Sequence, residues 1–156
     1  MNSAVAITTY APSNVDFYPE RLKHTLDSLK STYNGHIIIV DDGSTNLEHI
    51  RYLQLCGCKV IFKKSNGGIA RAKNTCIRVM RDLNVDNGFL VDDDILFCPG
   101  WYEAYIEAHE KTGLNHFSWF HRAYGSYYYK EEIIGDFPVT RCQPLTNGVC
   151  LFITRG

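Results

Sequence analysis

The sequence predicts an α/β protein with a mostly parallel sheet, helices on both faces of that sheet, and short mixed strands towards the C-terminal end. Two observations predict this fold class. Up to about residue 110, short apolar runs alternate with segments in which apolar residues recur every three or four positions. Beyond Gly113, the chain is rich in aromatic and β-prone residues instead. Alternating strands and helices are typical of parallel sheets, and the later change indicates short mixed or antiparallel strands.

Two strand–helix units make up the N-terminal third. The run Ala4–Thr9 predicts a buried strand, and the helix after it begins near Pro19, because proline is favoured in the first helical turn. The sequence HIIIV at 36–40 predicts a strand covered on both faces, since it lacks polar alternation. Leu22, Leu26 and Leu29 lie on one face of the first predicted helix, and Leu47, Ile50 and Leu53 mark the second helix.

Two further units and a distinct C-terminal part follow. KVIF at 59–62 and GFLV at 88–91 predict the third and fourth strands, and helical spacing extends from Ile69 to Leu83 between them. Pro99 opens a helix that carries Trp101, and the segments HFSWF, SYYYK and GVCLFIT predict the later strands. No linker, repeat or low-complexity tract interrupts the chain, so residues 1–156 are predicted to form one domain.

Composition and charge exclude several classes of protein. The 156 residues, 45% of them hydrophobic, are enough for one domain with its own core. A net charge of −1 and a pI near 6.6 give no basic excess for binding nucleic acid or an anionic membrane. No apolar run is long enough to span a membrane, and the start MNSAVAITTY lacks a signal-peptide layout, which favours a cytoplasmic location. The six cysteines lack metal-binding spacing and are expected to be free thiols.

Polar clusters follow each of the first four predicted strands. They are Thr8-Thr9-Tyr10, Asp41-Asp42-Gly43-Ser44, the segment KSNGG at 64–68, and Asp92-Asp93-Asp94. In an open parallel sheet, ligands bind outside the carboxyl ends of the strands, so the four clusters together predict a site. Each cluster alone also has a structural interpretation, because Asp-Gly and Asn-Gly form turns and Ser44 could cap a helix.

The aspartate triplet is the cluster that most needs an explanation. Its three carboxylates follow a hydrophobic strand and have no basic residue within five positions on either side. Two unit charges about 4 Å apart repel by about 1 kcal/mol in water and about 4 kcal/mol near a protein surface. Asp92-x-Asp94 offers hard oxygen ligands suited to Mg²⁺ or Mn²⁺, and such an ion bridging a diphosphate would relieve the repulsion. The alternative interpretation is a solvated acidic turn.

Together these segments resemble the GT-A glycosyltransferases, and most closely glycosyltransferase family 2. The matching pieces are VAITTYAP, IIIVDDGST, NGGIARAKN and FLVDDDILFCPGW, which contains the D-x-D motif. The resemblance covers about residues 4–102 in order, and TNGVCLFITR is more loosely similar to the turn and strand beneath the donor sugar. It implies a metal-dependent enzyme that moves a sugar from a nucleotide-diphosphate sugar to a hydroxyl of a glycan or other acceptor.

The resemblance also implies roles for individual residues. Asp41 would accept the imide N–H of the base, which favours a UDP-sugar because uracil has this group and cytosine lacks it, while thymidine and guanine stay open. Asp94 would be the main Mn²⁺ or Mg²⁺ ligand, with Asp92 as the second. The other implied contacts to the nucleotide sugar are Thr8, Thr9 and Tyr10 around the base, Asn66, Gly67, Arg71 and Asn74 near the diphosphate, Asp92 or Asp93 at the ribose, and Gly148 beneath the sugar. A solvent-facing helical arginine is the alternative for Arg71.

The sequence departs from the family at the general base. An inverting transferase needs a group, ordinarily a carboxylate, that takes the proton from the acceptor hydroxyl. Family 2 usually carries it after the strand matched by residues 148–154, where this sequence stops, so the chain is either part of a longer enzyme or a compact variant. Asp136, in IIGDFP, is the remaining candidate. The alternative function is a nucleotide-sugar-binding module without its own base, whereas a Rossmann dehydrogenase is disfavoured because no G-x-G-x-x-G follows the first strand.

Overall fold

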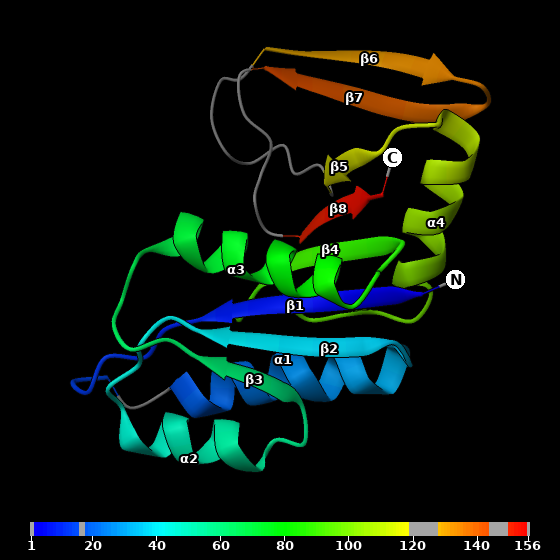
Figure 1. Ribbon diagram of the computed structural model, residues 1–156. Coiled ribbons are helices and arrows are strands. Elements are labelled where there is room, and N and C mark those ends of the chain that lie inside the picture. The colour runs from blue at the N-terminus through cyan, green and yellow to red at the C-terminus, as the bar shows by residue number, and fades with distance from the viewer. Residues whose placement is uncertain (1, 16–17, 119–127, 144–149, 156) are drawn as a thin grey trace.

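A six-stranded sheet forms the centre of the protein, with strand order β3-β2-β1-β4-β8-β5, and β6 and β7 form a separate hairpin (Figure 1). The computed structural model describes residues 2–15, 18–118, 128–143 and 150–155. Its elements are β1 (Ser3–Thr9), α1 (Tyr18–Thr32), β2 (His36–Asp41), α2 (Leu47–Leu55), β3 (Lys59–Phe62), α3 (Ile69–Asp82), β4 (Asn87–Asp92), α4 (Trp101–Thr112), β5 (His116–Ser118), β6 (Tyr128–Ile134), β7 (Phe137–Gln143) and β8 (Cys150–Thr154).

The sheet confirms the predicted α/β class and its mixed C-terminal part. Strands β1 to β4 are parallel, whereas β8 runs antiparallel to both β4 and β5. In the parallel register, Thr9 lies opposite Asp41 and Thr8 lies opposite Asp92. The carboxyl ends of β1, β2 and β4 therefore meet at one edge, which is where the sequence predicts a site.

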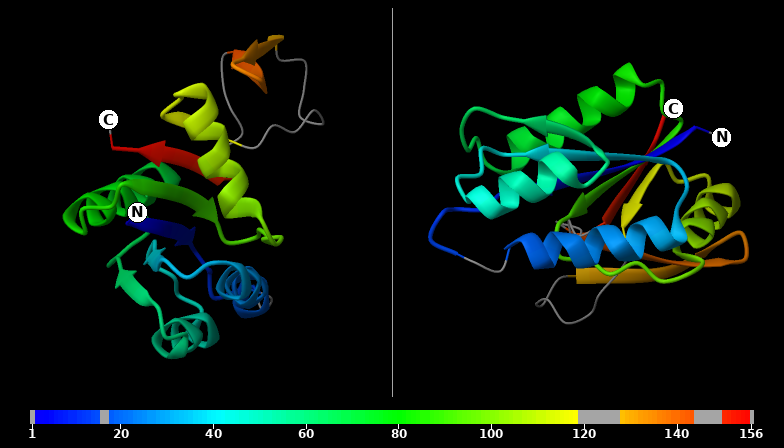
Figure 2. Two further views of the ribbon diagram at one scale, coloured as in Figure 1. Left: turned by 90° about the vertical axis from the view of Figure 1, so that its right-hand side faces the viewer. Right: turned by 90° about the horizontal axis from the view of Figure 1, so that it is seen from below.

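Helices cover both faces of the sheet, with α3 on one face and α1 and α4 on the other (Figure 2). The alternation of side chains along β1 supplies both cores. Val5 and Ile7 are fully buried in the core that includes α1, whereas Ala4 and Ala6 are fully buried in the core that includes α3. Small side chains on this second face leave room for a helix to lie against the sheet, and α3 packs there through Ala72, Cys76 and Met80.

Aromatic residues after the triplet belong to the core. The ring centroids of Phe89 and Trp101 are 5.0 Å apart, and those of Phe89 and Tyr105 are 5.4 Å apart, so α4 is fixed against β4 by edge-to-face packing. Five cysteines are free thiols, as expected: Cys56, Cys58, Cys76, Cys98 and Cys150. Among the described residues, no helix combines the length and apolarity that crossing a membrane requires.

Candidate functional site

An open cavity of about 390 Å³ lies at the carboxyl ends of β1, β2 and β4. We call it the strand-end cavity. Its lining confirms that the sequence-predicted clusters come together, and it also contains residues that those clusters do not include. The lining residues from the four clusters are Thr8, Thr9, Tyr10, Asp42, Asn66, Gly68, Asp92, Asp93 and Asp94, and the residues from outside them are Arg21, Ile69 and Ala72.

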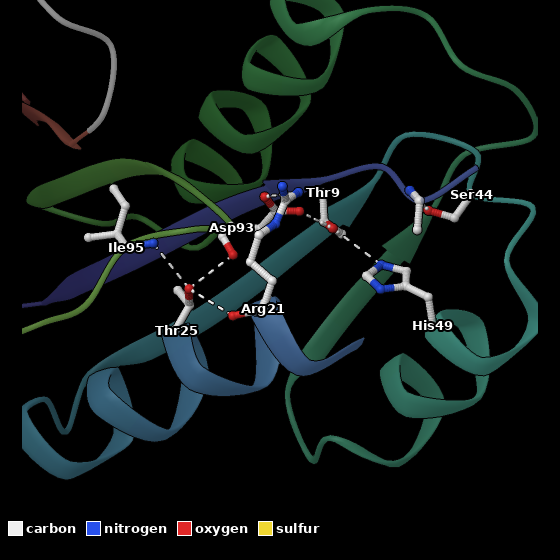
Figure 3. Close-up of polar contacts among 8 residues, drawn as sticks. Thr9, Arg21, Thr25, Ser44, His49, Asp93 and Ile95 are labelled. Atoms are coloured by element: carbon white, nitrogen blue, oxygen red, sulfur yellow. Dashed lines mark hydrogen bonds and ion pairs between the residues drawn. The ribbon is translucent and has the colours of Figure 1, made fainter. Parts of the chain in front are cut away.

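Asp93 is the buried anchor of the aspartate triplet. Its Oδ1 accepts a hydrogen bond from Arg21 Nη2 at 2.7 Å, and its Oδ2 accepts one from Thr9 Oγ1 at 2.5 Å (Figure 3). The Thr25 hydroxyl donates to the backbone carbonyl of Asp93 at 3.0 Å and accepts from the Ile95 backbone N–H at 3.2 Å. Side chains from β1 and α1 therefore hold residues 93–95 in place, and this carboxylate is occupied within the protein.

Asp92 is paired with a lysine from α3. Its Oδ1 lies 3.1 Å from Lys73 Nζ, at a contact where both side chains are partly exposed. Burial raises the pKa of Asp92, and the neighbouring Lys73 opposes that shift. By sequence position alone, the negative charge of the triplet has no positive neighbour. That interpretation was wrong, because Arg21 and Lys73 approach the triplet from helices that are distant in sequence.

Asp94 differs from its two neighbours because its carboxylate is exposed at the cavity and makes no ion pair with any described residue. The described residues contain no group of three or more histidine, cysteine, aspartate or glutamate side chains that could enclose a metal ion. Mg²⁺ and related ions need only one or two protein carboxylates when phosphates and water complete the shell. A free carboxylate at Asp94 with Asp92 beside it fits that kind of site.

The two aspartates that end β2 have different positions. Asp41 is 2% exposed and does not line the cavity, because its carboxylate accepts hydrogen bonds from the Ser44 hydroxyl and from the Ser44 backbone N–H at 3.1 Å. Asp42 does line the cavity. It pairs with Lys63 and accepts from the backbone N–H groups at 67 and 68, at 3.1 and 2.8 Å. The structure thus places Asp42, in place of the predicted Asp41, where a bound base could meet a carboxylate.

The structure separates Arg71 and Asn74 from the aspartates. Both are exposed and line a second hollow of about 320 Å³, which also includes Gly67 and Arg78. Arg71 at the diphosphate stays a prediction that this position does not favour, because the α3 side chain paired with the triplet is that of Lys73. Residues two apart on a helix point in directions about 200° different, so only one of the two can face the cavity.

Asp136 lies far from the strand-end cavity. It is in the turn between β6 and β7, and a Cβ added at the neighbouring Gly135 would lie 3.2 Å from the Lys111 carbonyl oxygen, near the C-terminal end of α4. Figure 1 shows this turn at the opposite end of the sheet from the carboxyl ends of β1 and β2. Asp136 as general base stays a prediction that this position does not support. Gly148, predicted beneath the donor sugar, lies outside the described residues.

Comparison with known proteins agrees with this arrangement of strands and helices. The sequence profile of glycosyl transferase family 2 matches residues 5–153, which is nearly the whole chain. The chain belongs to this family. An uncharacterised glycosyltransferase of Acanthamoeba polyphaga mimivirus is 35% identical to this family 2 chain over 148 residues. That match covers 91% of the chain but only 57% of the viral protein, so the chain spans little more than half of this relative's length.

Solved structures share the fold of this family 2 protein. The mannosyltransferase PcManGT of Pyrobaculum calidifontis, in complex with GDP-Man and Mn²⁺, matches with a TM-score of 0.58 and 16% identity, over 74% of this chain and 34% of that one. TarS of S. aureus (residues 1–349), in complex with UDP-GlcNAc, matches with a TM-score of 0.56 and 18% identity, over 74% and 33% of the two chains. At such identities the likeness shows the GT-A arrangement alone.

Proposed function

We propose that this chain binds a nucleotide-diphosphate sugar, most favourably a UDP-sugar, in the strand-end cavity and transfers the sugar to an acceptor hydroxyl with a divalent cation. The observation that carries the proposal is the convergence of three strand ends and the start of α3 on one cavity that contains four aspartates. Membership of family 2 supports the same chemistry. We propose that residues 1–156 form one glycosyltransferase domain, because β8, the last strand, pairs with β4 in the central sheet.

The nucleoside would lie over the end of β1. Tyr10 is 36% exposed in the cavity wall, and Thr8 has a buried hydroxyl without a hydrogen-bond partner in the described residues. Asp42 is the carboxylate that could meet the nucleobase, because it lines the cavity, whereas Asp41 does not line it and faces Ser44. A carboxylate accepts the imide N–H of uracil, which supports a UDP-sugar donor.

The diphosphate would lie between α3 and the aspartate triplet. Asp94 would hold the divalent ion with Asp92, and Lys73 would face the phosphates from the side of α3. When bound, such an ion screens the diphosphate charge and assists departure of the nucleotide. The N-terminal end of α3, at Gly68 and Ile69, also lines the cavity and favours anions.

The second candidate function is a nucleotide-sugar-binding module that lacks its own general base. Asp93 is occupied by Arg21 and Thr9, and Asp42 is occupied by Lys63 and two backbone N–H groups. Asp92 and Asp94 are assigned to the metal, so the described lining leaves no free carboxylate for an acceptor hydroxyl. Assays of sugar release and sugar transfer distinguish the two functions.

The first test is calorimetric titration of UDP with and without Mn²⁺. We expect Mn²⁺ to strengthen binding to the wild-type protein, and Asp94→Asn to remove most of that gain, because the variant loses the one free carboxylate at the cavity. Asp136→Asn is the control, since it removes an aspartate far from the cavity. Equal UDP affinity with and without Mn²⁺ would exclude the metal-dependent site.

A further inference from the structure

His49 is fully buried beside Thr9, a lining residue of the strand-end cavity, although neither the predicted site nor the cavity lining includes His49 itself. It lies in the first turn of α2, and its backbone N–H donates to Oδ1 of the N-cap residue Asn46 at 2.9 Å. Asn46 is tied to the segment after β1, because its backbone N–H donates to the Ala11 carbonyl at 3.1 Å and its side chain donates to the Val15 carbonyl at 2.8 Å. A capped helix start thus fixes the imidazole beside the end of β1.

The hydrogen atoms in this region can be assigned by counting donors. His49 Nε2 lies 3.2 Å from Thr9 Oγ1, which lies 2.5 Å from Asp93 Oδ2 (Figure 3). The Asp93 carboxylate, paired with Arg21, can only accept, so the single Thr9 hydroxyl hydrogen points to it. Thr9 Oγ1 then accepts from His49, and Nε2 must carry the ring hydrogen. Burial lowers the pKa of His49 more than the nearby Asp41 and Asp93 raise it, which favours the neutral ring.

We propose that His49 is a positioning residue for the nucleotide-sugar site: it holds the Thr9 hydroxyl in the orientation that donates to Asp93, and so fixes the turn that carries Asp92 and Asp94. The inference rests on the function proposed above. Arg21 and Thr25 hold Asp93 from the side of α1, whereas Thr9 holds it from β1. In the chain from His49 to Thr9 to Asp93, each hydrogen bond polarises the next. Without the imidazole, the Thr9 hydroxyl is free to turn away and one side of the turn loosens.

The test compares UDP affinity in the presence of Mn²⁺ for two substitutions of His49. His49→Phe keeps a flat ring but has no donor, whereas His49→Gln keeps an N–H donor that can reach Thr9. We expect His49→Phe to weaken UDP binding about tenfold and His49→Gln to stay within about threefold of wild type. If His49→Phe does not fold, His49→Asn replaces it, because its amide is too short to reach Thr9.

Leu53→Ala is the matched control for loss of core packing. Leu53 lies four residues farther along α2 and is 1% exposed, but it belongs to the apolar core and its side chain has no polar atom that could join the chain of hydrogen bonds. Its truncation should lower the melting temperature while leaving UDP affinity within about twofold of wild type. A loss of UDP affinity in Leu53→Ala equal to that in His49→Phe would overturn the positioning role.

A double-mutant cycle with Thr9→Val decides whether His49 acts through Thr9. Once the Thr9 hydroxyl is absent, His49→Phe should weaken UDP binding by less than about a further twofold. Losses that multiply, or a His49→Gln variant as weak as His49→Phe, would overturn the inference. If the wild-type protein binds UDP and His49→Phe binds it equally well, the positioning role is overturned and the proposed function stands. If the wild-type protein does not bind UDP, the proposed function is refuted together with the positioning role.

Discussion

Single side chains set the electrostatics of the strand-end cavity. Asp93 and Asp92 each face one basic group, Arg21 at 2.7 Å and Lys73 at 3.1 Å. Only Asp94 is left with an exposed carboxylate and no ion pair among the described residues. The triplet therefore combines an anchor, a charge-balanced carboxylate and a carboxylate without an ion pair among the described residues, and the three consecutive residues are not interchangeable.

The raised pKa of Asp92 predicts a pH-dependent cost in stability. Because its folded-state pKa lies above the ordinary value of 3.8, the folded protein binds this proton more tightly than the unfolded chain does. The resulting stability is present in full below pH 3.8 and is lost as the pH rises through the raised pKa. We expect wild-type protein to lose stability relative to Asp92→Asn over that window. Urea unfolding of both proteins from about pH 4 to about pH 7 measures this, and a constant difference would contradict it.

Lys73 and Arg71 provide a matched pair of substitutions on one helix. Lys73→Ala should weaken UDP binding in Mn²⁺ about tenfold, because it removes the cation beside Asp92 and the phosphates. Arg71→Ala should change it less than about twofold, because Arg71 lines the second hollow. Titration calorimetry of both variants gives the comparison. A larger loss in Arg71→Ala would return the diphosphate to the position that the sequence predicted.

At the scale of elements, the turn after β2 joins two walls of the cavity. Gly43 has a φ of 80°, and a Cβ added there would lie 2.4 Å from the Ser65 carbonyl carbon. Asp42 holds the same loop through its hydrogen bonds to Gly67 and Gly68. The β2 turn and the segment before α3 therefore form one packed unit.

Gly43→Ala is expected to destabilise the protein by more than about 2 kcal/mol, since a left-handed conformation alone costs about 1–2 kcal/mol and the overlap with Ser65 adds to it. Gly57→Ala is the control, because Gly57 has a φ of 73° with no atom within 4 Å of the added Cβ. Urea denaturation of both variants separates conformational cost from overlap. Equal losses would show that the β2 turn does not depend on close packing against 65–66.

Strand ends were predictable from the sequence, whereas the partners of the aspartates were not. Parallel strands bring their carboxyl ends to one edge whatever helices lie between them, so local apolar runs located the four clusters. Arg21 and Lys73 reach the triplet across the packing of α1 and α3, which local pattern does not specify. The apolar stripe Ala72, Cys76 and Met80 does contain a usable signal, because it shows which face of α3 lies against the sheet and limits where Arg71 and Lys73 can point.

At the scale of the whole molecule, the C-terminal strands β6, β7 and β8 belong to two different sheets. β8 rejoins the main sheet, where Cys150 lies opposite Val91 next to the triplet, and its carbonyl accepts from the Tyr105 hydroxyl at 3.2 Å. The β6–β7 hairpin lies beyond the sheet and packs near α4. Its turn holds Asp136 away from the cavity, so the position gives no support to Asp136 as the general base.

The chain is expected to release sugar from a UDP-sugar to water faster than it transfers sugar to an acceptor. The described cavity has carboxylates for a metal-bound diphosphate, and Lys73 is paired with one of them, Asp92. If Asp92 and Asp94 hold the metal ion as proposed, the described lining leaves no carboxylate free to accept the proton of a hydroxyl, because Asp93 is held by Thr9 and Arg21. General-base assistance is typically worth about 10²- to 10⁴-fold in rate, so transfer without it loses its advantage over hydrolysis. The measurement compares UDP release with transfer to a panel of sugar acceptors in Mn²⁺. Asp136→Asn should change neither rate, and fast transfer by the wild-type chain would show that a base lies within it.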